Sequence, residues 1–254
     1  MKNSTISIKQ KIIDTFNTYV RGKTADISAS NQKHDGRGGH WLETQMGIVH
    51  NRSNSPDIDG FEMKNSTSTK TTFGDWSADY YIFKDKNIIL SRDEFMHIFG
   101  KPNVNKDMRY SWSGEPIPKY NKYNKFGQIL IISPNEDIII QYNFLKDCRP
   151  HKSGIVPKNL QHDSLILAKW SRSWMKKKLE NKFNKLGWFK CQTDKNGIYT
   201  NIVFGEPIQW ASWLSEIKKG LVFFDSGMHQ NNSRNYSHWR ANNKYWQEKI
   251  TSTY

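Results

Sequence analysis

Short apolar runs separated by turn residues recur along this chain, and they constrain it to a fold that contains paired strands. The clearest pair covers residues 129–132 and 138–142, which are rich in isoleucine and flank a turn at residues 134–136. Such runs, joined by a short polar turn, are typical of a β-hairpin. A second pair, residues 189–192 and 198–204, flanks an Asn-Gly turn, which favours the same structure. We therefore expect antiparallel strands at two places.

Apolar residues at helical spacing alternate with these strand signals. Their spacing predicts helices over residues 6–20 and 170–186, and another over residues 211–217 that leads into a strand at residues 221–224. Ser91 is a suitable N-cap for a further short helix. The alternation predicts a mixed α/β (α+β) fold in a chain long enough for one large domain.

The remaining segments have less regular patterns. Their polar, glycine-containing composition predicts a loop at residues 21–39 and an exposed excursion at residues 101–127. Residues 41–48 favour a short helix that carries Glu43. A further short strand is expected at residues 58–63, and residues 80–83 and 88–90 are expected to form two short strands paired with each other.

The charge of the chain indicates its partner. Thirty-eight Lys and Arg residues against 24 Asp and Glu residues give a net charge of +14. Because lysine and arginine displace counterions from phosphates, this excess favours a nucleic acid, and a basic protein with no such partner is the alternative. No apolar run is long enough for a transmembrane helix, and residues 1–10 lack the apolar core of a signal peptide. The two distant cysteines, Cys148 and Cys191, favour a reduced, cytoplasmic setting.

Residues 55–64 combine carboxylates with a lysine. Glu62 and Lys64 are two positions apart on a predicted strand, so their side chains point to the same face, and Asp57 precedes them after a proline. Carboxylate oxygens suit Mg²⁺, which activates water and polarises a phosphoryl oxygen, while a lysine stabilises developing charge. The alternative is an exposed ion pair between Glu62 and Lys64, worth about 0–1 kcal/mol. Asp59 competes with Asp57 as a metal ligand.

Three neighbouring features favour the catalytic interpretation. Glu43 lies upstream on the predicted helix and offers a third carboxylate. A glycine-rich basic segment at residues 34–39 contains Arg37, a candidate contact to a DNA backbone. A hydroxyl-rich segment at residues 66–70 ends at Lys70 and is a candidate phosphate binder.

The order of Glu43, Asp57, Glu62 and Lys64 resembles the Glu…Asp…Glu-x-Lys arrangement of the MutH-like branch of the PD-(D/E)xK nucleases. The spacing is most similar to that of the MvaI and BcnI type II restriction endonucleases. The resemblance implies that Asp57 and Glu62 bind Mg²⁺, that Glu43 supports them and that Lys64 is catalytic. It also implies a restriction-endonuclease-like core, a mixed β-sheet flanked by helices, with a DNA-recognition lobe.

Two C-terminal segments extend the resemblance. Residues 224–229 and 236–240 flank an Asn- and Ser-rich loop and are similar to the family's strand, basic loop and histidine-bearing strand. The resemblance implies DNA-facing roles for His229, Arg234, His238 and Arg240. Of these, it places His238 beside the catalytic centre. The alternative for His238 is a structural histidine, and the alternative for Arg240 is a contact to a phosphate instead of a base. The strand at residues 221–224 lacks the family's arginine, so the target sequence stays open.

These observations lead to one principal hypothesis. We expect a type II restriction endonuclease that hydrolyses double-stranded DNA with Mg²⁺ and leaves 5′-phosphates. We expect a monomer and a single nuclease chain over residues 1–254, with the catalytic core mainly in residues 1–100 and mixed core and DNA-recognition elements in residues 101–254. A cognate DNA methyltransferase would belong to the same system without binding the enzyme. The alternatives are a MutH-like repair nicking endonuclease and a non-catalytic DNA-binding protein.

Overall fold

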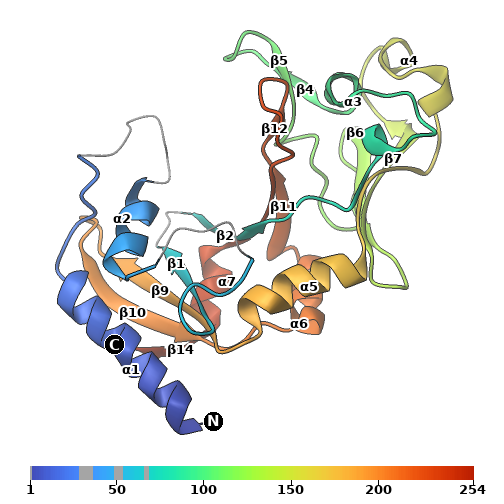
Figure 1. Cartoon of the computed structure of the whole chain (residues 1–254). Coiled ribbons are helices and arrows are strands. Elements are labelled where there is room, and N and C mark those ends of the chain that lie inside the picture. Colours follow the sequence, from blue (N-terminus) through green and yellow to red (C-terminus); the bar gives the residue numbers. More distant parts are fainter. Residues whose placement is uncertain (1, 29–36, 49–53, 66–68) are drawn as a thin grey trace. The chain divides into compact units, whose positions relative to one another are not determined.

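The chain folds into two compact units, in a computed structural model that Figure 1 shows. The structure describes residues 2–28, 37–48, 54–65 and 69–254. Unit 1 comprises Met1–Thr71, Lys178–Trp210 and Asn242–Tyr254, and unit 2 comprises Thr72–Lys177 and Ala211–Ala241. Unit 1 combines segments from both sides of residue 100, so the assignment of catalytic and recognition roles to residues 1–100 and 101–254 stays a prediction.

Unit 1 is built on a four-stranded sheet in the order β1-β9-β10-β14. Its strands are β1 (Phe61–Asn65), β9 (Gly187–Thr193), β10 (Tyr199–Gly205) and β14 (Ile250–Thr253). β1 runs parallel to β9, whereas β10 is antiparallel to both β9 and β14. The helices of this unit are α1 (Lys2–Tyr19), α2 (Arg37–Gln45), α7 (Asn243–Glu248) and the C-terminal end of α5 (Arg172–Phe183). Unit 1 is therefore a mixed sheet with helices packed on it.

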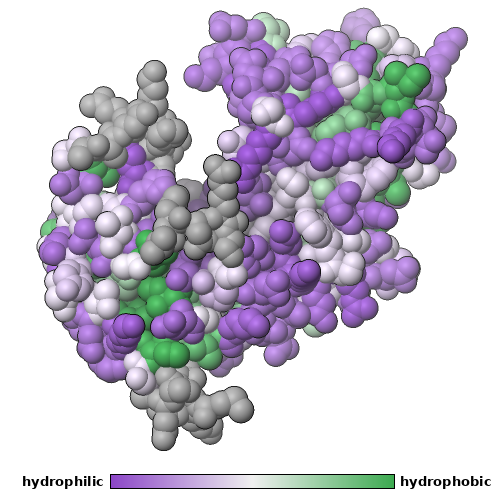
Figure 2. Space-filling model, viewed as in Figure 1, coloured by the Kyte–Doolittle hydropathy of each residue, from purple (hydrophilic) through white to green (hydrophobic). Residues whose placement is uncertain are grey.

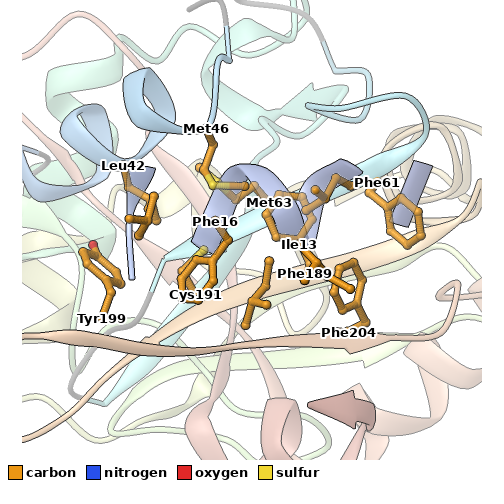
Figure 3. Close-up of a cluster of buried hydrophobic side chains, with 13 residues drawn as sticks. Ile13, Phe16, Leu42, Met46, Phe61, Met63, Phe189, Cys191, Tyr199 and Phe204 are labelled. Atoms are coloured by element: carbon orange, nitrogen blue, oxygen red, sulfur yellow. The ribbon is translucent and has the colours of Figure 1, made fainter. Parts of the chain in front are cut away.

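One face of this sheet carries the apolar core of unit 1 (Figure 3). Met63 of β1 and Phe189 of β9 are partners in register and both belong to this core. They pack with Phe16 of α1 and Leu42 of α2, which are fully buried. Because side chains alternate along a strand, the residues between Phe61 and Met63 and after Met63 point to the opposite face. That face, which bears Glu62 and Lys64, is left for polar groups.

Unit 2 contains three small sheets. Their strand orders are β3-β8-β7-β6, β11-β13-β2 and β12-β5-β4. The strands of the first sheet are β3 (Tyr80–Tyr81), β6 (Phe126–Ile132), β7 (Ile138–Asp147) and β8 (Leu165–Trp170). Those of the other two are β2 (Lys70–Asp75), β4 (Lys101–Asn103), β5 (Arg109–Trp112), β11 (Val222–Ser226), β12 (Met228–His229) and β13 (Ser237–Asn242). The helices are α3 (Arg92–Phe99), α4 (Lys152–Ile155), most of α5, α6 (Trp210–Lys218) and short 3₁₀ turns at Ile82–Lys84 and Lys158–Leu160.

Packed aromatic rings fill the core of unit 2. Trp170, Trp213 and Trp239 are fully buried, and the ring of Trp239 lies 5.4 Å from that of Trp170 and 5.2 Å from that of Trp213. Phe224 of β11 packs against Trp170 at 4.8 Å. Aromatic pairs at such distances and tilts stabilise a core beyond the area that they bury. Part of the abundance of tryptophan in the sequence therefore reflects the interior of this unit.

The structure confirms most of the predicted elements. The hairpin of β6 and β7 pairs Ile132 with Ile138, and the hairpin of β9 and β10 encloses the Asn-Gly turn. α1, α2, α6 and β11 match their predicted segments within a few residues. Ser91 caps α3 in a capping box, because its hydroxyl accepts from the Glu94 amide while the Glu94 carboxylate accepts from the Ser91 amide. The mixed α+β fold class is confirmed.

Five local predictions were wrong. Residues 88–90 form no strand, because the Asp85 carboxylate closes a turn onto Asn87 and β3 pairs with β8 instead. Residues 101–127 contain the hairpin of β4 and β5, and Trp170 ends a strand before the helix begins at Arg172. The last part of the loop predicted at residues 21–39 is the first turn of α2, and residues 29–36 lie outside the described residues. The strand predicted at residues 58–63 begins only at Phe61.

The face of the molecule that Figure 2 shows is predominantly polar. Figure 2 shows hydrophilic residues over most of the visible face of both units, with hydrophobic residues confined to smaller areas. None of the helices in the described ranges is long and apolar enough to cross a membrane.

Candidate active site

Glu62 is the centre of a buried polar cluster in unit 1. Its side chain is 2% exposed, and its Oε1 accepts a hydrogen bond from Lys64 Nζ at 2.6 Å. The same oxygen lies 3.1 Å from the Nζ of Lys182, which α5 supplies. The other carboxylate oxygen, Oε2, is buried and has no hydrogen-bond partner among the described residues. Both contacts to lysine thus fall on one carboxylate oxygen, and the second oxygen has none among the described residues.

Asp57 approaches this cluster from the turn before β1. Its Oδ2 accepts the backbone N–H of Met63 at 2.9 Å, which ties the carboxylate to the strand between Glu62 and Lys64. The turn requires positive φ at Asp59 (43°) and Gly60 (100°). Glycine adopts the second of these angles without a steric penalty, so the chain reverses sharply into β1. Asp59 itself is exposed on that turn.

Burial sets the electrostatics of the cluster. Desolvation raises the pKa of Glu62, although Lys64 and Lys182 lower it, and the nearby negative charge of Asp57 raises it further. Desolvation also lowers the pKa of Lys64, against the attraction of Glu62. The Lys64 Nζ lies 5.1 Å from the centre of the Phe183 ring, so an apolar group covers one side of it. The electrostatic interactions among Asp57, Glu62, Lys64 and Lys182 are stronger than in water, because the buried surroundings have a lower dielectric constant.

Three other residues selected from the sequence also lie in unit 1. Glu43 lies on α2, and its Oε2 is 3.5 Å from His40 Nδ1. Arg37 is the first residue of α2, and Lys70 is the first of β2, whose first two residues belong to unit 1 and the rest to unit 2. Both side chains are partly exposed. Within the described ranges, no three His, Cys, Asp or Glu side chains come close enough together to hold a metal ion. The structure therefore brings Asp57 to Glu62, while the role of Glu43 as a supporting carboxylate stays a prediction.

The four C-terminal residues selected from the sequence lie in unit 2, where both arginines form ion pairs. Arg240 Nε lies 3.0 Å from Asp225 Oδ2 across the β11–β13 ladder. Arg234 Nη2 lies 2.7 Å from Asp75 Oδ2 on β2. The side chain of Arg234 is 63% exposed, so this ion pair contributes little to stability. Their DNA-facing roles stay predictions.

The two histidines of this region have lowered pKa values. Burial is the main cause for His238, whose pKa Arg240 lowers further while Asp75 opposes both effects. Burial also lowers the pKa of His229, and Arg109 and Arg92 add to the effect. Both rings are therefore disposed toward the neutral form.

Sequence reasoning missed Lys182. No local pattern marks it, because it lies in a lysine-rich helix and meets Glu62 only through the packing of α5 on the sheet. Phe183, its neighbour, is fully buried and packs against Trp246 of α7 at 6.2 Å. The buried position of Phe183 fixes the end of α5 and so directs Lys182 to the carboxylate.

Comparison with known proteins decides the family. The family model of the LlaMI restriction endonuclease matches residues 20–254 of the chain. The chain belongs to the LlaMI restriction endonuclease family. This restriction endonuclease is 49% identical to the type II restriction enzyme ScrFI of Lactococcus lactis subsp. cremoris, over 96% of this chain and 97% of that protein.

A solved structure supports the same conclusion for the fold. The restriction endonuclease MvaI, in a complex with its cognate DNA substrate, matches with a TM-score of 0.61 over 100% of this chain and 98% of that one. The identity is only 12%, so this match concerns the fold. This restriction endonuclease is thus a site-specific deoxyribonuclease of the type II class, and the sequence-based prediction of its family and enzyme class is confirmed.

Proposed function

We propose that this enzyme cuts both strands of duplex DNA at the Glu62 cluster, with Mg²⁺ held by Asp57 and Glu62. The observation that carries the proposal is the buried Glu62 carboxylate, which binds two lysines through one oxygen and leaves the other without a partner. A buried anionic oxygen is costly unless a cation or donor satisfies it. Mg²⁺ keeps several waters and needs only one or two protein carboxylates beside a phosphate, so this donor set fits it.

The residues of the site then have distinct roles. A bound Mg²⁺ supplies Lewis acidity toward the phosphoryl oxygen and a more acidic water. Lys64 stabilises the charge that develops on the phosphate, and its position on Glu62 holds its Nζ at the metal-binding carboxylate. Asp57 is oriented by the Met63 amide. We propose Glu43 as a supporting carboxylate and His238 as a residue beside the phosphate.

The DNA contacts extend beyond the carboxylates. We propose Arg37 and Lys70 in unit 1, and His229, Arg234 and Arg240 in unit 2, as groups that bind the duplex. The net charge of +14 supports a polyanionic partner. MvaI is described in complex with cognate DNA, which supports double-stranded DNA as the substrate here. We further propose a monomeric enzyme, a cytoplasmic location and a cognate methyltransferase that protects host DNA without binding this chain.

Incubation of the purified enzyme with supercoiled plasmid and MgCl₂ tests the proposal. Discrete linear fragments with 5′-phosphate ends are expected, and EDTA should abolish them. Mapping the fragment ends gives the recognition sequence and the cut position. Nicked circles alone would indicate a nicking endonuclease. DNA binding without cleavage under any divalent ion would indicate a non-catalytic DNA-binding protein.

A matched pair of variants assigns the metal ligand. Asp57→Asn should abolish cleavage, because it removes the charge beside Glu62, whereas Asp59→Asn on the exposed turn should cut at the wild-type rate. Equal loss in both variants would contradict the choice of Asp57.

Sedimentation of the free enzyme at several concentrations tests whether it is a monomer.

A further inference from the structure

Lys190 is a second buried lysine on the face of the unit 1 sheet that bears Glu62 and Lys64. The proposed mechanism does not use it. It is the partner of Lys64 in the parallel pairing of β1 with β9, so both side chains leave the sheet on the same face. Lys190 is 7% exposed. Among the described residues it forms no ion pair, and burial is the sole cause that lowers its pKa.

A pocket of about 270 Å³ lies over this lysine, between β9, β10 and α7. The residues that line it include six amide and hydroxyl side chains, namely Gln192, Thr193, Thr200, Asn201, Asn243 and Gln247. In the described part of the chain, its lining contains no Asp or Glu. A cation that is almost entirely buried, surrounded by neutral donors and without an acidic partner, is complementary to an anion.

We propose that this pocket is a phosphate subsite in which Lys190 binds a backbone phosphate of the DNA other than the one that is cleaved. The inference rests on the proposed function, because that function puts a DNA strand on the face that bears Glu62 and Lys64. Lys190 leaves the adjacent strand on the same face. A strand whose scissile phosphate lies at Glu62 thus offers further phosphates to neighbouring parts of this face. The Lys190 ammonium binds the phosphate as a point charge, and the amide and hydroxyl groups donate hydrogen bonds to its oxygens.

A phosphate bound in this pocket helps to position the DNA for cleavage. A phosphate held beside the reacting one fixes the DNA strand at a second point, so the scissile bond is oriented before the chemistry begins. The anion also offsets the desolvation of Lys190, which favours the protonated lysine when DNA is bound. Lys190 is in this sense a DNA-positioning residue, distinct from Lys64, which holds the Glu62 carboxylate.

The salt dependence of DNA binding tests the proposal. Affinity for a short duplex that carries the mapped site is measured in EDTA over a series of NaCl concentrations. Lys190→Met keeps the length of the side chain and removes the charge. Because each phosphate contact contributes about 0.9 to the slope of log K against log[salt], the slope should be shallower by about that amount. Lys195→Met, at an exposed position in the β9–β10 turn, changes the net charge equally and should keep the wild-type slope.

Each outcome of this experiment has a defined meaning. A wild-type slope in Lys190→Met overturns the subsite, while failure of the wild-type enzyme to bind duplex DNA overturns the proposed function instead. Thermal stabilisation by inorganic phosphate that Lys190→Met loses, together with an unchanged DNA slope, shows a free-phosphate site and overturns the DNA assignment. If Lys190→Met does not fold, a structure of the wild-type enzyme with the duplex decides, because an empty pocket overturns the proposal and a phosphate on Lys190 Nζ supports it.

Discussion

Both units bury a carboxylate with basic partners, and the two clusters differ in how completely they are satisfied. In unit 2, Asp147 is 2% exposed, and both of its oxygens accept hydrogen bonds from Arg149. The hydroxyl of Tyr142 donates to Asp147 Oδ2 as well, at 2.9 Å. In unit 1, Glu62 is equally buried, yet Glu62 Oε2 has no partner among the described residues. We call the Asp147 cluster closed, because both carboxylate oxygens are hydrogen-bonded, and the Glu62 cluster open, because one oxygen is not.

This difference supports a structural role for Asp147 and the proposed catalytic role for Glu62. A buried charge contributes to stability only when its hydrogen bonds are complete, as they are for Asp147. An open buried carboxylate is retained at a cost, and such sites are where binding and catalysis are concentrated. The pKa of Glu62 is raised by burial despite two lysines, which is consistent with a site arranged for a cation that protein side chains do not supply.

Lys64→Ala gives the largest expected effect. The rate of DNA cleavage should fall by about 10³-fold, because a preorganised charge beside the reacting phosphate is lost. Specific DNA binding should be largely retained, since Glu62 keeps its contact with Lys182. Single-turnover cleavage and gel-shift measurements separate the two effects, with exposed Lys185→Ala as the control. Retained cutting by Lys64→Ala would refute its assignment as the catalytic lysine.

Arg149→Met should affect stability instead of catalysis. It leaves Asp147 buried without its principal partner, which costs about 3–5 kcal/mol in the free energy of unfolding. Urea unfolding followed by tryptophan fluorescence measures the change. Glu115→Gln removes an exposed carboxylate that binds Lys101 and Lys125, and it should leave the unfolding midpoint almost unchanged. A similar small change in both variants would show that the closed cluster is not a source of stability.

Arg92→Gln tests whether a hydrogen-bonded arginine of unit 2 also contributes to DNA recognition. Arg92 donates to the side chains of Asn235 and Asn232 and to the carbonyls of His229 and Arg234, so it holds the loop between β12 and β13. Loss of charged hydrogen bonds predicts a 10- to 100-fold loss of discrimination, roughly, between the cognate site and a site with one changed base pair.

The readout for Arg92 must distinguish positioning from general destabilisation. We expect KM to rise while kcat at saturating DNA stays near the wild-type value. Arg172→Gln, which removes an exposed arginine paired with Glu136, is the matched control in the same unit. Unchanged discrimination in a folded Arg92→Gln enzyme would separate this loop from base recognition.

The smallest expected effect concerns an exposed pair and its pH dependence. Hydrogen bonds from Lys101 and Lys125 lower the pKa of Glu115 from 4.5 to about 2. Because the folded-state pKa is below the ordinary one, the stabilising contribution is complete above about 4.5 and disappears as the pH falls toward 2. NMR titration of the Glu115 carboxyl measures this value, and Lys101→Met should move it upward. An unshifted pKa in the wild-type enzyme would contradict the ion pairs.

Local patterns were sufficient for much of the fold. The β6–β7 and β9–β10 hairpins were predicted because the strands and the turn of each are contiguous in the sequence. The wrong strand pair at residues 80–83 and 88–90 shows the limit of this reasoning. Tyr80 and Tyr81 pair with Lys169 and Ala168, and that distant partner leaves no trace in the local pattern.

The alternation of side chains along a strand determined the core of the candidate site. It placed Glu62 and Lys64 on one face, and the turn before the strand placed Asp57 next to them, because both relations are set within a few residues. Tertiary structure alone decided the rest. It buried Glu62, brought Lys182 to its carboxylate and set Lys190 beside Lys64, since these contacts depend on the packing of α5 and the pairing of β9 with β1. The sequence therefore determined which groups are the candidates for the chemistry, and the packing of distant segments decided their burial and their partners.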